Sequence, residues 1–306
     1  MKLALNPLQY IRAMRPHQWI KNLLLFAGIL FSRHFTEWNL LLRAFAGFGL
    51  FCLLAGAVYI LNDLRDVEND RLHPRKKLRP IAAGLIVPRR ALMFALLAAA
   101  YGLVLSFLLS PAFGWTALLY FVVTVLYSEF FKRVVVLDTI LVAAGFVLRA
   151  VAGVFVIRIW DGPYIPMTPW FVICVFFLAL FIAVCKRRHE LLNVQNAPNH
   201  RQVLDQYTPA FLDQMIAVST SAAIFSYTLY LISAYGGDSD ERALRMTFTL
   251  PFVIYGIFRY LYLVYRCDEG GEPETLVLKD KPLLLNTLLW LVLLMVLHED
   301  KVPPIY

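Results

Sequence analysis

Oxygen-bearing side chains gather between Asn62 and Asp70, at the end of a long apolar stretch. Asn62, Asp66 and Asp70 are spaced four apart, and Asp63 stands beside the first. Residues four apart on a helix share a face, so this spacing predicts that the carboxylates and the amide point into one space. Carboxylates that close repel one another unless a cation lies between them.

A magnesium ion is the cation that this set of ligands favours. Mg²⁺ prefers oxygen ligands and is commonly bound by one or two carboxylates together with substrate phosphates. We therefore predict a Mg²⁺ site made of Asn62, Asp63, Asp66 and Asp70, and we expect the three aspartates to be catalytic. A solvated charged loop is the alternative, although such a pattern seldom opens directly off a membrane span.

Basic residues follow the aspartates and would balance an anionic substrate. They are Arg71, Arg75, Lys76, Lys77 and Arg79. Arg75, Lys76 and Arg79 are predicted to bind substrate phosphates, because cationic side chains form charge-assisted hydrogen bonds with phosphate oxygens. Anchoring at the cytoplasmic membrane surface is the alternative role for these residues.

A second charged cluster, residues 186–190, also follows an apolar stretch and reads Lys-Arg-Arg-His-Glu. Lys186 and Glu190 lie four residues apart and share a helical face, which predicts an ion pair beside Arg187. Two cations and one carboxylate would suit a phosphate clamp. We expect Lys186 to be catalytic, and Arg187 and Glu190 to bind substrate opposite the aspartates. Membrane anchoring also explains any single member of this cluster.

Four further positions are candidates for substrate binding. Tyr127 and Lys132 bracket a short loop together with Asp138, although a tyrosine near a membrane surface is usually an aromatic anchor. Arg149 lies within an apolar stretch, where an arginine is costly and normally faces a partner or a polar cavity. It would hold a lipid phosphate or form a structural ion pair. Lys21 lies at the mouth of the first apolar stretch, within reach of a phosphate.

Composition indicates the class of protein that positions these residues. Of the 306 residues, 60% are hydrophobic and only 16% are charged, whereas soluble domains average about 25% charged residues. This predicts an all-α polytopic membrane protein with one domain over residues 1–306 and an interfacial segment at about 1–16. The net charge of +8 is spread over short loops, which argues against a nucleic-acid partner.

Nine apolar stretches are long enough to cross a membrane, which takes about 20 helical residues. The predicted spans are 18–32, 39–61, 90–110, 113–130, 137–157, 168–185, 209–235, 246–265 and 281–298. Most lysines and arginines then fall on the side of the N-terminus, so the positive-inside rule predicts that the N-terminus and the charged clusters are cytoplasmic. A transporter would need polar residues at both faces, so the sequence favours an enzyme of the inner or plasma membrane.

The pattern Asn-Asp-x-x-Asp-x-x-x-Asp after the second predicted span resembles the UbiA superfamily of intramembrane prenyltransferases. The resemblance implies a nine-helix UbiA-like bundle with a cytoplasm-facing active site. That superfamily usually carries a second motif, Asp-x-x-x-Asp, after helix 6. This chain has Lys186-Arg187-x-x-Glu190 there, which weakens the interpretation as a prenyl-diphosphate enzyme.

The departure matches the decaprenyl-phosphate phosphoribosyltransferase branch of the superfamily, which the chain resembles from about residue 11 to 295. The motifs that carry the resemblance are Arg15-Pro16-x-Gln18-Trp19-x-Lys21-Asn22, Tyr59-x-x-Asn62-Asp63-x-Arg65-Asp66-x-Glu68-x-Asp70-Arg71-x-His73-Pro74, Arg79-Pro80-Ile81-Ala82-Ala83-Gly84, Lys186-Arg187-x-x-Glu190-Leu191 and Gly271-Glu272-Pro273-Glu274. This branch transfers 5-phosphoribose from phosphoribosyl pyrophosphate (PRPP) to a polyprenyl phosphate and releases pyrophosphate. In mycobacteria the product feeds cell-wall arabinan synthesis.

The resemblance implies Mg²⁺ as cofactor, PRPP and a polyprenyl phosphate lipid as substrates, and a homo-oligomer would suit the family. Lys186, Arg187, Arg79 and Lys21 would hold the donor phosphates. Tyr127, Lys132 and Glu190 would position the ribose or its 5-phosphate, and Arg149 would receive the lipid phosphate. The resemblance implies all of these roles.

Two alternatives remain at this stage. A prenyltransferase would move a prenyl group from its diphosphate to an aromatic acceptor, and it would favour a facing pair of aspartates after the sixth span. A non-catalytic lipid-phosphate binder or flippase would bind or transport its lipid without releasing pyrophosphate, and it would need polar residues leading to the far face.

Overall fold

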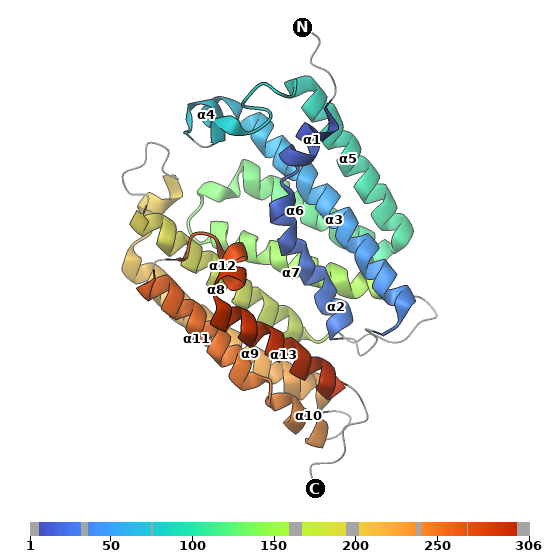
Figure 1. The fold of residues 1–306 in the computed structure, drawn as a ribbon, viewed down its shortest axis with the longest axis vertical. Helices are drawn as coiled ribbons and strands as arrows, with labels where there is room; N and C mark the ends of the chain where they lie inside the picture. The colour runs from blue at the N-terminus through green and yellow to red at the C-terminus, as the bar shows by residue number, and fades with distance from the viewer. Residues whose placement is uncertain are drawn as a thin grey trace. The chain divides into compact units, whose positions relative to one another are not determined.

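The computed structural model describes residues 6–31, 36–74, 76–158, 167–193, 202–236, 240–267 and 269–298. All regular elements within these ranges are helices, which confirms the all-α prediction (Figure 1). The chain divides into two compact units, which are described separately below. Unit 1 contains Met1–Ile29, His34–Phe131 and Leu148–Pro163, and unit 2 contains Leu30–Arg33, Lys132–Val147 and Tyr164–Tyr306.

Seven segments of the described chain are long and apolar enough to cross a membrane. They are α3 (Trp38–Arg65), α5 (Pro88–Leu109), α6 (Pro111–Glu129), α7 (Leu137–Ile157), α8 (Pro169–Asn193), α9 (Pro209–Tyr235) and the stretch Glu241–Arg266, which contains most of α10 (Asp240–Thr247) and all of α11 (Leu250–Arg266). These seven coincide with predicted spans, so the polytopic class is confirmed.

The other two predicted spans have a different form. Residues 18–32 fall on a 3₁₀ helix, η1 (Pro16–Leu25), which continues into the short helix α2 (Phe26–Leu30). Residues 281–298 form α13 (Lys281–His298), an apolar helix shorter than the seven above. The count of nine spans therefore stays a prediction.

In unit 1, α3 packs along α5 and contacts α6 and η1 (Figure 1). Small residues let the backbones approach closely: a Cβ on Gly28 would lie 2.4 Å from the backbone of Gly153. The N-terminal helix α1 (Pro7–Ala13) is capped by the Asn6 side chain and buries Ala13. This packing places η1 against the second half of α7. The helix α1 contacts α3.

Unit 2 is built on the long antiparallel pair α8 and α9, with α11 beside α9 and α13 beside α11 (Figure 1). Its core contains Phe181, Leu212, Tyr260 and Leu263, all nearly fully buried. Short elements join the long helices, namely η4 (Gln202–Gln206) before α9 and α12 (Pro273–Lys279) before α13. The polar end of α8 is thereby fixed against η4, because the two elements are in contact.

Candidate active site

The acidic cluster, defined as Asn62, Asp63, Asp66 and Asp70, lies where α3 gives way to α4 (Val67–Leu72). Asp66 joins the two helices, and its amide donates to the carbonyl of Asn62 at 3.0 Å. The amide of Asp70 donates in turn to the carbonyl of Asp66 at 2.8 Å. The four-residue spacing therefore persists across the junction, as expected for side chains on a common face.

Two carboxylates of the acidic cluster are buried and share one arginine. Asp63 is 2% exposed and Asp70 is 3% exposed. Nη1 of Arg79 donates to Oδ1 of Asp63 at 3.1 Å and to Oδ2 of Asp70 at 2.5 Å. Because one nitrogen reaches both carboxylates, a single cation at that point can satisfy two acidic side chains.

Arg15 is a second cation on Asp63, and it was not assigned a role from the sequence. Its guanidinium donates to Oδ1 of Asp63 and lies 4.9 Å from the ring centroid of Tyr59. The backbone of Arg15 is left-handed, with φ of 54°, which is uncommon for a residue with a side chain. Arg15 and Arg79 are each partly exposed, so both can leave Asp63 more easily than a buried cation could.

The side chains of the acidic cluster are chemically suited to bind a hard cation. Its side chains offer oxygen ligands, the set that Mg²⁺ prefers, and two of its carboxylates already meet at one guanidinium nitrogen. Within the ranges that the structure describes, no three His, Cys, Asp or Glu side chains surround one point as a formed metal centre. Arginine thus occupies the position between Asp63 and Asp70.

The predicted phosphate ligands of unit 1 are spread over several elements. Lys76 is exposed in η2 (Lys76–Leu78), and Lys21 is half-buried in η1. Tyr127 is half-buried near the end of α6. Arg75 lies outside the described residues. The last turn of α6 is tied to α3, because Arg65 pairs with Glu129 at 3.0 Å.

Arg149 belongs to a buried polar network within unit 1. Its Nε donates to Oδ1 of Asn22 at 2.8 Å, and its Nη2 donates to the hydroxyl of Tyr120 at 2.7 Å. The Tyr120 ring centroid lies 4.7 Å from the Arg149 Cζ atom. Asn22 also donates to the sulfur of Cys52 at 3.3 Å. These three side chains are neutral, and the network joins three spans and η1.

Unit 2 contains the opposite arrangement at the end of α8. The arginine cluster, defined as Asp138, Arg187, Glu190 and Tyr207, is centred on a guanidinium that is 5% exposed. Arg187 donates to Oδ2 of Asp138 at 2.7 Å and to Oε2 of Glu190 at 2.5 Å. Asp138 is fully buried. Glu190 of the predicted clamp therefore pairs with Arg187.

Tyr207 completes the arginine cluster, and no pattern in the sequence had indicated it. Its hydroxyl donates to Oδ1 of Asp138 and accepts from the amide of Val136, both at 2.7 Å. Val136 has a φ of 66°, which is strained for a β-branched residue. Burial, together with the bond to Asp138, raises the pKa of Tyr207. The hydroxyl therefore stays protonated and pins the strained turn to α7.

Two other predicted residues of unit 2 lie near these elements. Lys132 is half-buried in η3 (Phe131–Arg133), and Lys186 is half-buried on α8. Three residues after Lys186, His189 lies against the loop before α12. A Cβ on Gly271 would lie 2.7 Å from the His189 ring, and one on Gly270 would lie 2.9 Å from the His189 Cβ. Glycine at both positions therefore lets the loop rest on α8.

Comparison with known proteins identifies the family of this helical architecture. Residues 23–288 match the description "UbiA prenyltransferase family". The chain belongs to the UbiA prenyltransferase family. With seven candidate membrane spans in its described residues, it is an integral membrane protein of a transferase family.

Several relatives within the UbiA family carry one name. The chain is 34% identical over 92% of its length to the decaprenyl-phosphate phosphoribosyltransferase of Mycolicibacterium smegmatis, of which the match covers 89%. It is 34% identical to the enzyme of that name from Corynebacterium glutamicum, over 92% of this chain and 83% of the relative. The Mycobacterium tuberculosis enzyme is 32% identical, over 92% of this chain and 91% of the relative.

Solved UbiA structures share the fold. A UbiA homologue from Archaeoglobus fulgidus with bound GPP and Mg²⁺ superposes with a TM-score of 0.68 at 17% identity, covering 95% of this chain and 99% of that one. A structure described as digeranylgeranylglyceryl phosphate synthase gives the same TM-score at 16% identity and covers 95% of this chain and 98% of that one. The UbiA fold inferred from the aspartate motif is thereby confirmed.

Proposed function

We propose that this protein transfers 5-phosphoribose from PRPP to a polyprenyl phosphate and releases pyrophosphate in a Mg²⁺-dependent reaction. The observation that carries this proposal is the charge at the end of α8. There, Glu190 is already paired with the buried Arg187, and Lys186 is the neighbouring cation. A prenyl-diphosphate enzyme would need a second set of carboxylates at this point, and the relatives named above are phosphoribosyltransferases.

Asn62, Asp63, Asp66 and Asp70 would hold the metal ion. The ion would neutralise the negative charge that grows on the leaving pyrophosphate. The guanidinium of Arg79 lies between Asp63 and Asp70 and donates to both. When the carboxylates change partner, Arg79 becomes available to bind donor phosphate, which is the role expected from the sequence.

The bond changes need little from a general base. A phosphate oxygen of the acceptor lipid forms a bond to the anomeric carbon of the ribose, and the bond from that carbon to pyrophosphate breaks with its electron pair. The acceptor oxygen is already anionic, so no proton has to be removed from it. Positioning and charge stabilisation are therefore the main contributions of the protein.

We assign Arg187 a positioning role. Its guanidinium is buried and already bonded to Asp138 and Glu190, so a phosphate contact would have to break a buried ion pair. The arginine cluster then fixes the end of α8, and Lys186 binds a donor phosphate. Lys21, Arg75, Lys76, Tyr127, Lys132 and Arg149 keep the substrate-binding roles that the family resemblance implies.

A membrane assay with radiolabelled PRPP tests the proposal. We expect label to enter the lipid phase when Mg²⁺ and a polyprenyl phosphate are present, and to stay in the aqueous phase without either. Asp66→Ala should abolish the transfer. Glu68→Gln is the matched control, because Glu68 lies two residues after Asp66, in α4, but is exposed and pairs with Arg71 at 2.9 Å.

Two results would contradict the proposal. Transfer of a prenyl group from its diphosphate to an aromatic acceptor, with no label from PRPP, would identify an ordinary prenyltransferase. Full activity of Asp66→Ala would remove the acidic cluster from the reaction, even if PRPP remained the donor.

A further inference from the structure

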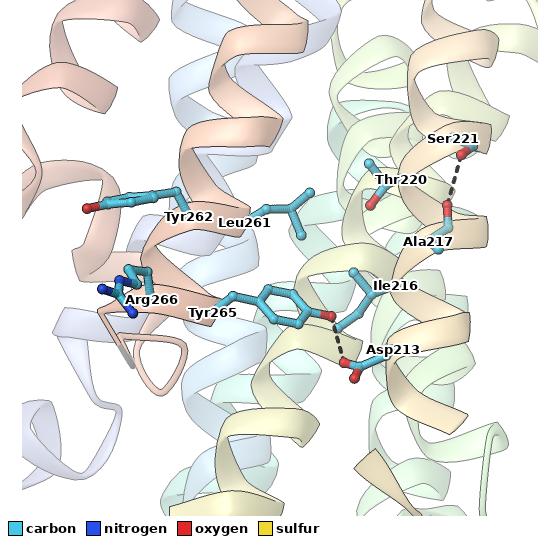
Figure 2. Close-up of a pocket in the computed structure, with 9 residues that line it drawn as sticks. All are labelled: Asp213, Ile216, Ala217, Thr220, Ser221, Leu261, Tyr262, Tyr265 and Arg266. Carbon is cyan, nitrogen blue, oxygen red and sulfur yellow. Dashed lines mark hydrogen bonds between the residues drawn. The ribbon is translucent and has the colours of Figure 1, made fainter. Parts of the chain in front are cut away.

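A groove lies between α9 and α11 in unit 2, and no residue of the acidic cluster or the arginine cluster lines it. Its volume is about 490 Å³, within the range of about 300–1,000 Å³ that small-molecule sites occupy. The residues that line it are Asp213, Ile216, Ala217, Thr220, Ser221, Leu261, Tyr262, Tyr265 and Arg266. Figure 2 shows Asp213, Tyr265 and Arg266 near the last turn of α11, and Leu261, Thr220 and Ser221 farther along the two helices.

Among the residues that the structure describes, the polar end of the groove has two arginines, Arg188 and Arg266, for the one carboxylate of Asp213. Asp213 accepts from Arg188 and from the hydroxyl of Tyr265, both at 2.6 Å, so its charge is balanced (Figure 2). The Arg188 guanidinium also lies 4.0 Å from the Tyr265 ring centroid. Arg266 is exposed and has no ion pair with any residue that the structure describes. An anionic group would therefore bind at Arg266.

A buried hydroxyl marks the other end of the groove. Thr220 is 6% exposed, and its Oγ1 has no hydrogen-bond partner among the described residues. In Figure 2 its side chain points from α9 toward Leu261 of α11. Thr220 follows Asp213 by two helical turns, or about 10 Å. A buried hydroxyl without a partner is costly, so a ligand that reaches this depth with an acceptor oxygen would gain a hydrogen bond.

The surroundings are those of a membrane surface. Val218, Phe225 and Phe258 on the same two helices are between 57% and 67% exposed, as expected for side chains that face lipid. Tyr262 and Tyr265 lie in the last turns of α11, and tyrosine favours the headgroup region of a bilayer. The groove thus runs from headgroup depth into the acyl region.

We propose that this groove binds one diacyl phospholipid with an anionic headgroup. The phosphate lies at Arg266, an ester carbonyl accepts a hydrogen bond from Thr220, and an acyl chain follows Ile216 and Leu261. Basic pockets between membrane helices are a known form of headgroup site. A polyprenyl phosphate matches less well, because only a hydrocarbon chain follows its phosphate and it has no carbonyl oxygen to accept a hydrogen bond from Thr220.

Native mass spectrometry of the delipidated protein tests whether the groove prefers an anionic headgroup. The probes are phosphatidylglycerol, phosphatidylcholine and a polyprenyl phosphate. Both lipids carry the phosphate, but the choline cation of phosphatidylcholine offsets its charge and repels Arg266, so we expect phosphatidylglycerol to bind about tenfold more tightly. Arg266→Gln should abolish the difference. Lys281→Gln is the matched control, an exposed cation at the start of α13 that does not line the groove.

A second pair of variants tests the depth of the site. Thr220→Val should weaken the binding of both phospholipids several-fold and leave the preference for the anionic phospholipid unchanged. Ser221→Ala should have no effect, because the Ser221 hydroxyl already donates to the carbonyl of Ala217 at 2.9 Å.

Three outcomes would overturn the proposal. Unchanged phosphatidylglycerol binding in Arg266→Gln would exclude the headgroup site. Polyprenyl phosphate that binds more tightly than phosphatidylglycerol, in an Arg266-dependent way, would make the groove an acceptor-lipid site. A homo-oligomer that retains no lipid and dissociates in Arg266→Gln would show that a second copy fills the groove.

Discussion

The acidic cluster and the arginine cluster are inverse arrangements of the same groups. At the end of α3, two arginines share the buried carboxylate of Asp63. At the end of α8, two carboxylates share the buried guanidinium of Arg187. The side chains of Arg15 and Arg79 are 19% and 25% exposed, whereas those of Arg187 and Asp138 are 6% and 0% exposed.

This difference in exposure indicates which cluster can exchange its partners and which one holds the fold in place. A partly exposed arginine can move into water when a metal ion takes its carboxylate, so the acidic cluster is suited to exchange partners. A fully buried pair cannot separate without a large desolvation cost, so the arginine cluster is suited to hold elements in place. Two segments of opposite net charge are therefore expected to carry different roles, and each expectation can be tested by removing one carboxylate.

The largest expected effect on stability comes from Asp138→Asn. Removing one partner of this buried ion pair leaves part of the Arg187 charge uncompensated and should lower the free energy of unfolding by about 3–5 kcal/mol. Denaturation of the purified protein in detergent measures the change. Asp213→Asn on α9 is the control, because its pair with Arg188 is partly exposed and should contribute only about 0–1 kcal/mol. Equal losses would remove the distinction between buried and exposed pairs.

Asp63→Asn should harm activity more than stability. We expect turnover in the PRPP assay to fall about 10²- to 10³-fold, because the growing charge on pyrophosphate loses its stabilisation. The free energy of unfolding should fall less than in Asp138→Asn, since Arg15 and Arg79 can be hydrated. Mg²⁺ should also cease to raise the melting temperature. An active Asp63→Asn that unfolds easily would reverse the roles assigned to the two clusters.

Tyr207→Phe should have an intermediate effect. It leaves the Val136 amide and one oxygen of Asp138 unsatisfied in a buried place, which should cost about 1–2 kcal/mol. Tyr265→Phe removes a similar bond, 2.6 Å long, from Asp213, but Tyr265 is 45% exposed and water can replace its hydroxyl. We expect the second variant to lose distinctly less stability in the same denaturation measurement.

Alkaline titration gives a further check on Tyr207. Burial raises its pKa above the ordinary value, so its contribution to stability is complete below about pH 10 and is lost as the pH rises toward the folded-state pKa. Stability of the wild type should therefore fall above about pH 10 by more than that of Tyr207→Phe. Parallel curves would show that the hydroxyl is not protected by burial.

The smallest effect is expected outside both clusters, at the contact between Arg259 and Asp280. The two hydrogen bonds from Arg259, at 3.1 and 2.8 Å, lower the pKa of Asp280. A lowered carboxyl pKa stabilises the fold above about pH 3.9 and the contribution is lost as the pH falls through the folded-state value. Asp280→Asn should flatten this acid limb of the stability curve slightly. Glu272→Gln, whose pair with Lys279 spans 3.9 Å at an exposed site, should leave it unchanged.

The sequence by itself determined the membrane class, and it predicted that the acidic cluster shares one helical face. Apolar stretches of helical length follow directly from composition, and seven of them are helices of that length here. The spacing of Asn62, Asp66 and Asp70 was informative because helical periodicity relates residues a few positions apart. The UbiA family was also readable, since its aspartate motif lies within nine consecutive residues.

Only the tertiary structure decided which charges meet. Arg15 reaches Asp63 across 48 positions, Arg187 reaches Asp138 across 49, and Tyr207 reaches Asp138 across 69. No local periodicity relates residues so far apart, because their approach depends on how the helices pack. Helical periodicity allows Glu190 to pair with either Lys186 or Arg187, which lie four and three positions before it. The structure shows that Glu190 pairs with Arg187, whose guanidinium also binds Asp138 from α7.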